Sequence, residues 1–138
     1  MTEKYEKILL NLSIKASKKG EVPVSALIVS NNKIIAKSFN RKNLDKNSLY
    51  HAEIICLQKA YKRLKRWNLN DCIMYVSLEP CDMCKILIEE SRINKVYYIL
   101  DKGICNNKYN KTEYEQMYAV NKVEFAKIID NFFKKIRK

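Results

Sequence analysis

Two hydrophobic periods alternate along the chain and divide it into segments of helical and of extended spacing. The first apolar positions recur every three or four residues, which predicts an N-terminal helix: Tyr5, Ile8, Leu9, Leu12 and Ala16. Gly20 follows this run and is a suitable helix stop. Residues 22–30, "VPVSALIVS", then predict a buried strand, "NNK" a tight turn, and residues 34–39, "IIAKSF", a second strand.

The middle of the chain continues the alternation of helix and strand. The polar loop "NRKNLDKNS" leads into a helix from about His51 to Leu64, and "CIMYVSL" predicts a further strand. "EPCDMCKILIEES" predicts a helix with Pro80 in its first turn, where proline is favoured, and "KVYYIL" predicts another strand. This order predicts a layered α/β domain in which helices pack on a sheet.

The C-terminal third has a less regular pattern. Within residues 104–122 we predict a capping box of Thr112 and Glu115, and a short strand in "MYAVNKV". Beyond them, apolar positions at helical spacing predict a last helix: Phe125, Ile128, Ile129, Phe132 and Ile136. The sequence contains no repeat and no linker, so we expect residues 1–138 to form a single domain.

Composition limits the class of protein. A hydrophobic content of 47% is typical of a globular chain, and no apolar run approaches the roughly 20 residues of a membrane span. The N-terminus "MTEKYEKILL" mixes acids with lysines, unlike a signal peptide. The five cysteines are an odd number in a chain without an export signal. We therefore expect a cytoplasmic protein whose cysteines serve metal binding or catalysis.

Charge adds a candidate partner. The chain has 27 basic and 15 acidic residues, a net charge of +12, and such a field favours a polyanion such as nucleic acid. The alternative is a compositional bias that supplies lysines without a binding role. The basic residues gather at the end of the second predicted helix and at the C-terminus: Lys59, Lys62, Arg63, Lys65 and Arg66, and Lys134, Lys135, Arg137 and Lys138.

Candidate metal ligands lie at two predicted helix starts. Cys81 and Cys84 are three residues apart, so they share one face of a first helical turn, where thiolates are stabilised and suit zinc. Taken alone, the pair is also compatible with a redox pair or with half of a structural four-ligand site. No thioredoxin-like context and no second C-x-x-C accompanies it.

The only histidine, His51, raises the number of candidate ligands to three. Three protein ligands with an open fourth position are typical of catalytic zinc, and Glu53 is then placed as the base that moves protons. The alternatives are a chance histidine and a helix-start acid favoured by the macrodipole. We expect the remaining cysteines to be small core or surface residues: Cys56, Cys72 and Cys105.

At these residues the chain resembles a known superfamily. "HAE" followed by "LEPCDMC" matches the H-x-E and P-C-x-x-C pattern of the zinc nucleobase deaminases. Within that superfamily it is similar to the bacterial tRNA-specific adenosine deaminases, which make inosine at the anticodon wobble position. The matching segments follow in order over residues 1 to about 103: "EVPVSALIV", "NNKIIAKSFNR", "HAEI", "MYVSLEPCDMC" and "SRINKV".

The resemblance implies a cytidine deaminase-like α/β fold, a three-layer α/β/α arrangement around a mixed sheet of about five strands, and a homodimer. It implies one zinc ion held by His51, Cys81 and Cys84, with Glu53 as the proton shuttle for hydrolytic conversion of adenosine to inosine in a tRNA anticodon stem-loop. It further implies that two residues contact the substrate: Asn40, which would hydrogen-bond the target nucleoside, and Phe132, near the anticodon loop.

Other functions stay open at this point. A deaminase of free guanine or cytosine, or of a nucleotide such as dCMP, would use the same chemistry, and a non-catalytic zinc-stabilised RNA-binding module is a further alternative. The chain also departs from the family pattern: Ser25 stands where glycine is usual, and Lys85-Ile86-Leu87 stand where a run of small residues is usual.

Overall fold

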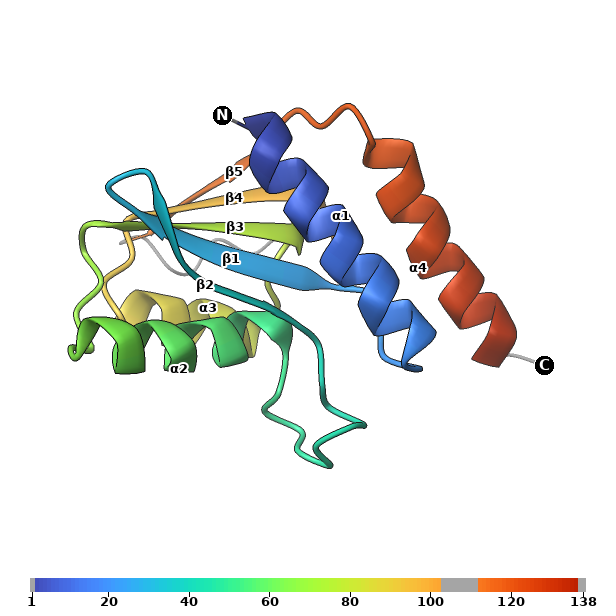
Figure 1. Ribbon diagram of the computed structural model, residues 1–138, viewed down its shortest axis with the longest axis horizontal. Helices are drawn as coiled ribbons and strands as arrows, with labels where there is room; N and C mark the ends of the chain where they lie inside the picture. The colour runs from blue at the N-terminus through green and yellow to red at the C-terminus, as the bar shows by residue number, and fades with distance from the viewer. Residues whose placement is uncertain (1, 103–111, 137–138) are drawn as a thin grey trace.

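A computed structural model describes residues 2–102 and 112–136. In these ranges the chain forms helices and strands in an alternating order (Figure 1): α1 Thr2–Lys18, β1 Ser25–Ser30, β2 Lys33–Phe39, α2 Ala52–Leu64, β3 Cys72–Leu78, α3 Asp82–Glu90, β4 Lys95–Leu100, β5 Glu113–Gln116 and α4 Lys122–Ile136.

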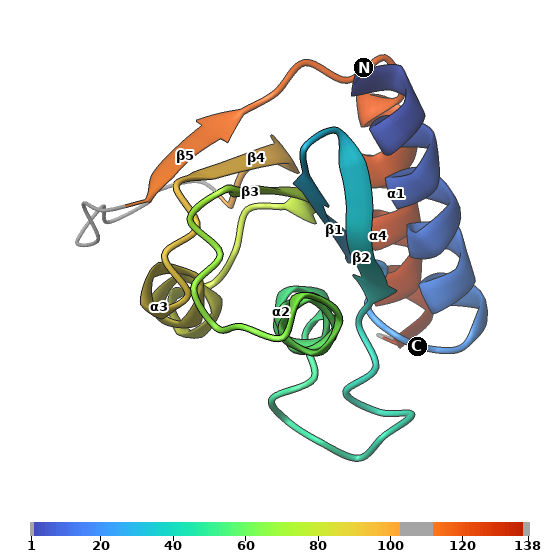
Figure 2. The same ribbon diagram turned by 60° about the vertical axis from the view of Figure 1, so that its left-hand side comes forward.

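The strands make one mixed sheet between two layers of helices. Its order is β2-β1-β3-β4-β5; β1 pairs antiparallel with β2 and β3, whereas β3, β4 and β5 run parallel. Helices α2 and α3 cover one face, and α1 and α4 cover the other (Figure 2). The predicted three-layer α/β/α fold with a five-stranded sheet is therefore confirmed.

The hairpin of β1 and β2 shows how local sequence sets the geometry. Asn31 and Asn32 both have positive φ, 51° and 63°, which a two-residue turn with φ above zero at both positions requires and which asparagine tolerates. Ser30 therefore pairs with Lys33, as expected for such a turn. At the end of α1, Gly20 takes φ 79° and the chain turns into β1, which confirms the predicted stop.

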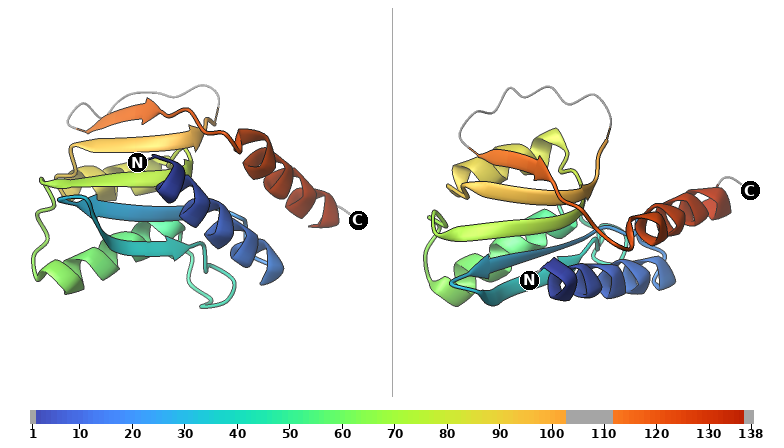
Figure 3. Two further views of the ribbon diagram at one scale, coloured as in Figure 1. Left: turned by 45° about the horizontal axis from the view of Figure 1, so that its top comes forward. Right: turned by 90° about the horizontal axis from the view of Figure 1, so that it is seen from above.

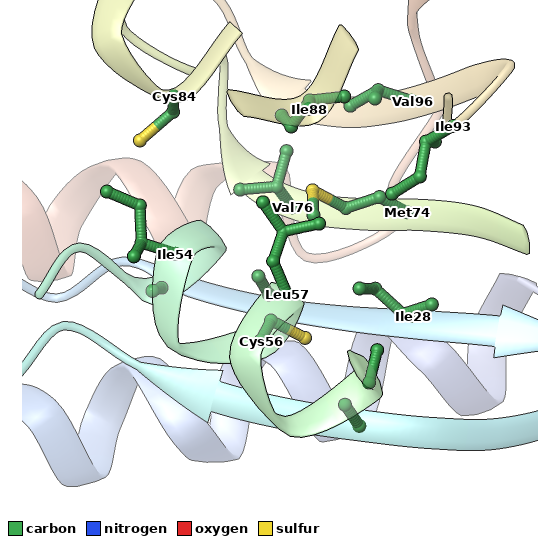
Figure 4. Packing of buried hydrophobic residues seen from close by; sticks show 14 of the residues in the cluster. Ile28, Ile54, Cys56, Leu57, Met74, Val76, Cys84, Ile88, Ile93 and Val96 are labelled. Atoms are coloured by element: carbon green, nitrogen blue, oxygen red, sulfur yellow. The ribbon is translucent and has the colours of Figure 1, made fainter. Parts of the chain in front are cut away.

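The sheet separates two hydrophobic cores. Strand β1 is buried along its whole length, and its side chains alternate between the cores: Ala26 and Ile28 pack beneath α2 and α3, and Leu27 and Val29 beneath α1 and α4. Figure 4 shows the first core, in which Met74 and Val76 of β3 meet α2 and α3. A strand buried on both faces reads as a continuous apolar run, as the sequence indicates.

The hydroxyl of Ser25 lies on the face of the sheet that α1 and α4 cover. It is fully buried, donates a hydrogen bond to the carbonyl oxygen of Leu9 at 2.7 Å and lies 2.8 Å from the hydroxyl of Ser13. The residue that replaces the usual glycine therefore ties β1 to α1.

Helix α4 is fastened to α1 by one buried carboxylate. Glu6 accepts hydrogen bonds from the backbone N–H groups of Val120 and Asn121, at 3.0 and 2.8 Å, just before α4 begins. The two helices lie side by side (Figure 3). This capping contact comes from a residue more than one hundred positions away in sequence.

Three local predictions are wrong. Thr112 and Glu115 form no capping box, because Glu113–Gln116 is strand β5, and the strand predicted in residues 117–123 lies earlier than expected. Cross-strand ion pairs hold β5 to β4: Lys95 contacts Glu113 at 2.7 Å and Glu115 at 3.2 Å.

Pro80 precedes the helix instead of lying in its first turn, because Cys81 is the N-cap of α3.

No helix in the part of the chain that the structure describes is both long and apolar enough to cross a bilayer.

Candidate metal centre and substrate cavity

The predicted metal ligands meet where α2 and α3 begin. His51 is the N-cap of α2 and Cys81 the N-cap of α3, both with extended backbone, and neither side chain caps its own helix. Instead, Nδ1 of His51 lies 3.7 Å from Sγ of Cys81 and 3.6 Å from Sγ of Cys84. The α2 and α3 helices pack on the same face of the sheet, so the two helix starts face each other.

The three side chains fit a zinc ion. Tetrahedral bonds of about 2.3 Å to sulfur and 2.0–2.1 Å to nitrogen place the ligand atoms about 3.6 Å apart. The two sulfur–nitrogen distances agree with that value, and all three ligand atoms lie within 4.8 Å of one another. Cys56 and Cys72 are buried outside this group, and Cys105 lies outside the described residues.

The three ligand side chains shift one another's pKa values. A hydrogen bond from Cys84, with a further contribution from His51, lowers the pKa of the Cys81 thiol to about 3. The same contact with Cys81, together with burial, raises the pKa of Cys84. The hydrogen bond with Cys81 also raises the pKa of His51. One thiolate is therefore present before any metal binds, which is the ionised form that zinc requires.

Glu53 carries a polar atom that the described chain leaves without a partner. The side chain is 3% exposed, and Oε1 is buried with no hydrogen bond to the residues described. Burial raises the pKa of this carboxyl. A buried acceptor without a partner is costly, so its persistence indicates a bound group or a water molecule at this position.

A cavity of about 350 Å³ opens beside these residues. His51, Cys81, Glu53 and Asn40 are among the residues that line it. Asn40 is 8% exposed, and its Oδ1 accepts the backbone N–H of Lys42 at 3.0 Å, so the side chain also serves as a loop-turn residue. The structure thus brings together five of the six predicted site residues, since Cys84 joins through the metal group.

Phe132 is placed differently from the other predicted residues. It is buried, with its ring edge-on to Phe133 at 5.4 Å, and it is not among the described residues that line the cavity. The α4 residues that line the cavity are Ile129 and Phe133. The contact of Phe132 with an anticodon loop stays a prediction.

Sequence reasoning missed part of the cavity wall. Glu79 and Lys102 belong to it, as do Lys42, Ile129 and Phe133. The position of Phe133 could have been predicted from helical spacing. Phe125 and Phe132 are seven residues apart on the buried side of α4, so Phe133 projects from another side of the helix. Lys102 and Glu79 come together only through the pairing of β3 with β4.

Two residues of the basic cluster predicted at the end of α2 make contacts within the fold. Nη1 of Arg63 donates to the carbonyl oxygens of Ile34 and Ile35 on the edge strand β2, at 3.3 and 3.1 Å. Arg66 pairs with Asp71 at 2.8 Å. These two guanidinium groups are used within the fold, and Arg137 and Lys138 of the C-terminal cluster lie outside the described residues.

Comparison with known proteins agrees with this arrangement. The sequence profile of the MafB19-like deaminase family matches residues 2–137. The tRNA-specific adenosine deaminase of Rickettsia bellii (strain RML369-C) is 38% identical over 138 residues, which covers 88% of this chain and 92% of the relative. The enzyme of the same name from Bacillus subtilis (strain 168) is 33% identical over 146 residues, which covers 99% of this chain and 91% of the relative.

Solved structures are similar as well. A structure from studies of A-to-I editing by tRNA:A34 deaminases is 25% identical with a TM-score of 0.76, covering 85% of this chain and all of that one. Guanine deaminase from Nitrosomonas europaea has a TM-score of 0.80 at 17% identity, covering 96% of this chain and 84% of that chain, and so shares the fold. The chain belongs to the MafB19-like deaminase family and, by its identity to curated relatives along nearly their whole length, to the tRNA-specific adenosine deaminases.

Proposed function

We propose that the protein is a zinc-dependent hydrolase that converts adenosine to inosine at the wobble position of a tRNA anticodon. The observation that carries the proposal is the ligand group of His51, Cys81 and Cys84 beside the buried, unpartnered carboxylate oxygen of Glu53. The names of its relatives support the nucleoside and the tRNA.

The three ligands leave room for water. His51, Cys81 and Cys84 would hold one zinc ion per chain, and in catalytic zinc sites a fourth position stays open. When bound, zinc supplies the Lewis acidity that makes water nucleophilic near neutral pH. The cavity of about 350 Å³ lies within the size range of small-molecule sites.

Glu53 would carry the protons of the reaction. Water adds at C6 of adenine, and the amino group leaves as ammonia, so one proton must reach N1 and another must reach the departing nitrogen. Burial raises the pKa of Glu53, which makes the carboxyl a better proton acceptor than an exposed one, so it can take a proton from water and pass it on inside the cavity. One residue therefore serves as base and then as acid.

The remaining wall would orient the nucleoside. Asn40 offers an amide at the side of the cavity, fixed there by its hydrogen bond with Lys42. Ile129 and Phe133 supply an apolar surface from α4 for the base or ribose, and Lys102 brings a cation toward phosphates. A free base would lack the phosphate that such a cation attracts.

Three organisational features accompany this proposal. The homodimer implied by the resemblance, the single domain over residues 1–138 and the cytoplasmic location all stay predictions. Sedimentation of the purified protein tests the first, because a dimer has twice the mass of the 16.3 kDa chain.

Substrate assays test the proposed function. Purified protein of known zinc content is incubated with tRNA transcripts, anticodon stem-loops, free adenosine, guanine, cytosine and dCMP, and inosine and ammonia are measured. We expect inosine only in RNAs with adenosine at the wobble position, and no product from Glu53→Gln, which keeps the shape of the side chain but cannot shuttle protons. Turnover of guanine, cytosine or dCMP with all RNAs untouched would contradict the tRNA proposal. RNA binding without ammonia release would favour the binding module.

A further inference from the structure

A second hollow lies next to the catalytic cavity. Its volume is about 810 Å³, more than twice that of the cavity, and it runs along the edge strand β2 between α1 and α2. We call it the basic groove, because five cations line it, with one carboxylate: Lys15, Lys37, Arg41, Lys59 and Lys62, and Asp45. None of the catalytic or metal-binding residues described above lies in it.

The charges of the basic groove are only partly neutralised within the protein. Asp45 pairs with Arg41 at 2.9 Å, and Nζ of Lys59 donates to the carbonyl oxygen of Lys37 at 2.9 Å. The side chains of Lys15, Lys37 and Lys62 are exposed along the groove. The carbonyl partner of Lys59 is neutral, so Lys59 keeps its charge and joins these three cations in facing a phosphate backbone.

Aromatic rings lie between the cations. Lys15 and Arg41 both lie over the ring of Phe39, at 5.7 and 5.6 Å from its centre. Tyr50 and Tyr61 are half-buried in the wall of the groove. Cations that follow a backbone, interleaved with rings on which bases stack, are the features that single-stranded nucleic acid requires.

The groove and the cavity share one wall. Residues of the loop that follows β2 alternate between them: Asn40 and Lys42 line the cavity, whereas Arg41 lines the groove. The same alternation occurs at the other end of the loop, where Tyr50 lines the groove and His51 the cavity. The backbone N–H of Arg41 donates to the carbonyl oxygen of Tyr50 at 3.0 Å and closes this wall. A strand that leaves the cavity over the wall enters the groove directly.

We propose that the basic groove binds the RNA strand that flanks the target adenosine, with phosphates at Lys15, Lys37 and Lys62 and bases against the aromatic wall. The inference rests on the proposed function, since it names where the same RNA substrate lies beyond the reacting base. It assigns affinity for RNA to the groove and chemistry to the cavity, so the two are separable by substitution.

Steady-state kinetics on an anticodon stem-loop test this inference. Lys37→Ala combined with Lys62→Ala removes one exposed cation from each of two sides of the groove, β2 and α2, and neither residue touches the cavity. Lys7→Ala combined with Lys122→Ala is the matched control, because both lysines are exposed, both lie outside groove and cavity, and the net charge falls by the same amount. We expect the groove variant to raise KM roughly tenfold at unchanged kcat, while the control stays near the parent.

Salt dependence and direct binding separate the outcomes. The slope of log Kd against log salt should flatten by about 0.7 for each lost phosphate contact in the groove variant, measured by fluorescence anisotropy on the Glu53→Gln background. If the groove and control variants have the same KM and the same salt slope, the inference is overturned. The proposed function still stands in that case if the parent protein deaminates the RNA. Failure of the parent to deaminate any RNA would refute the proposed function, and the anisotropy comparison would still decide whether the groove binds RNA. Loss of a dimer in the groove variant, with RNA affinity unchanged, would assign the groove to a second copy instead and overturn the inference.

Discussion

The ammonium of Lys85 lies 3.1 Å from Oε2 of Glu79, and both side chains are almost completely buried, at 2% and 3% exposure. Oε1 of Glu79 accepts a hydrogen bond from the backbone N–H of Lys102 at 3.1 Å. The backbone N–H of Glu79 donates to the carbonyl oxygen of Leu100 at 2.8 Å. The pair therefore joins the segment before Cys81 to the segment after β4, where two parallel strands end.

This buried pair has a structural consequence, and its lysine is one of the residues that depart from the family pattern. Burying a single charge costs several kcal/mol, so each member of the pair depends on the other. Because Glu79 and Lys102 both line the cavity, the pair holds the cavity wall in place as well as the approach to Cys81. Lys85 thus contacts the cavity wall through Glu79.

Lys85→Met should lower the free energy of unfolding by about 3–5 kcal/mol, because it leaves the carboxylate of Glu79 buried without its cation. Methionine keeps much of the length and the apolar stem of lysine, so lost packing contributes little. Chemical denaturation of the zinc-loaded protein measures the change. The double variant Lys85→Met with Glu79→Gln removes both charges and should recover most of the loss. A single variant as stable as the parent would mean that the pair contributes nothing.

Cys84→Ala should lose its zinc, because it removes one of three protein ligands from a site that has no fourth among the described residues. Cys56→Ala is the matched control: this cysteine is equally buried in the same core but lies outside the ligand group. Metal analysis after dialysis should find about one zinc per chain in the parent and in Cys56→Ala. Full zinc retention in Cys84→Ala would refute the ligand assignment.

Zinc affinity should rise with pH. Cys81, with a pKa lowered to about 3, is ionised before zinc binds and releases no proton. Cys84 and His51 have raised pKa values, so zinc displaces a proton from Cys84 and from the protonated fraction of His51. Competition with a chromophoric chelator near neutral pH should therefore give a slope of log affinity against pH of about one to two. A slope near zero would show that both thiols are already ionised, and a slope clearly above two would show that Cys81 also releases a proton and would contradict its lowered pKa.

The parts of the fold that the sequence predicted well are the ones with local causes. Two asparagines with positive φ set the turn between β1 and β2, and the C-x-x-C spacing places Cys81 and Cys84 on one helical turn. Strand β5 was predicted at the wrong residues, because pairing with β4 and the ion pairs of Lys95 hold it, and neither leaves a hydrophobic period. The contact of Arg63 with the edge of β2 could not be predicted, because it depends on how α2 packs against a strand about thirty residues earlier.

Adjacent phenylalanines of α4 should have opposite roles, and one pair of substitutions separates them. Phe133 is 39% exposed and lines the cavity, so Phe133→Ala should raise KM for the RNA substrate several-fold at nearly unchanged stability, because it removes apolar surface from the substrate wall. Phe132 is 7% exposed, so Phe132→Ala should cost about 3 kcal/mol of unfolding free energy and change KM little while the protein stays folded. Thermal unfolding and steady-state kinetics on one anticodon stem-loop measure both quantities for both variants. The reverse result, with KM raised by Phe132→Ala and not by Phe133→Ala, would support the substrate contact predicted from the sequence and would require α4 to turn about its axis when RNA binds.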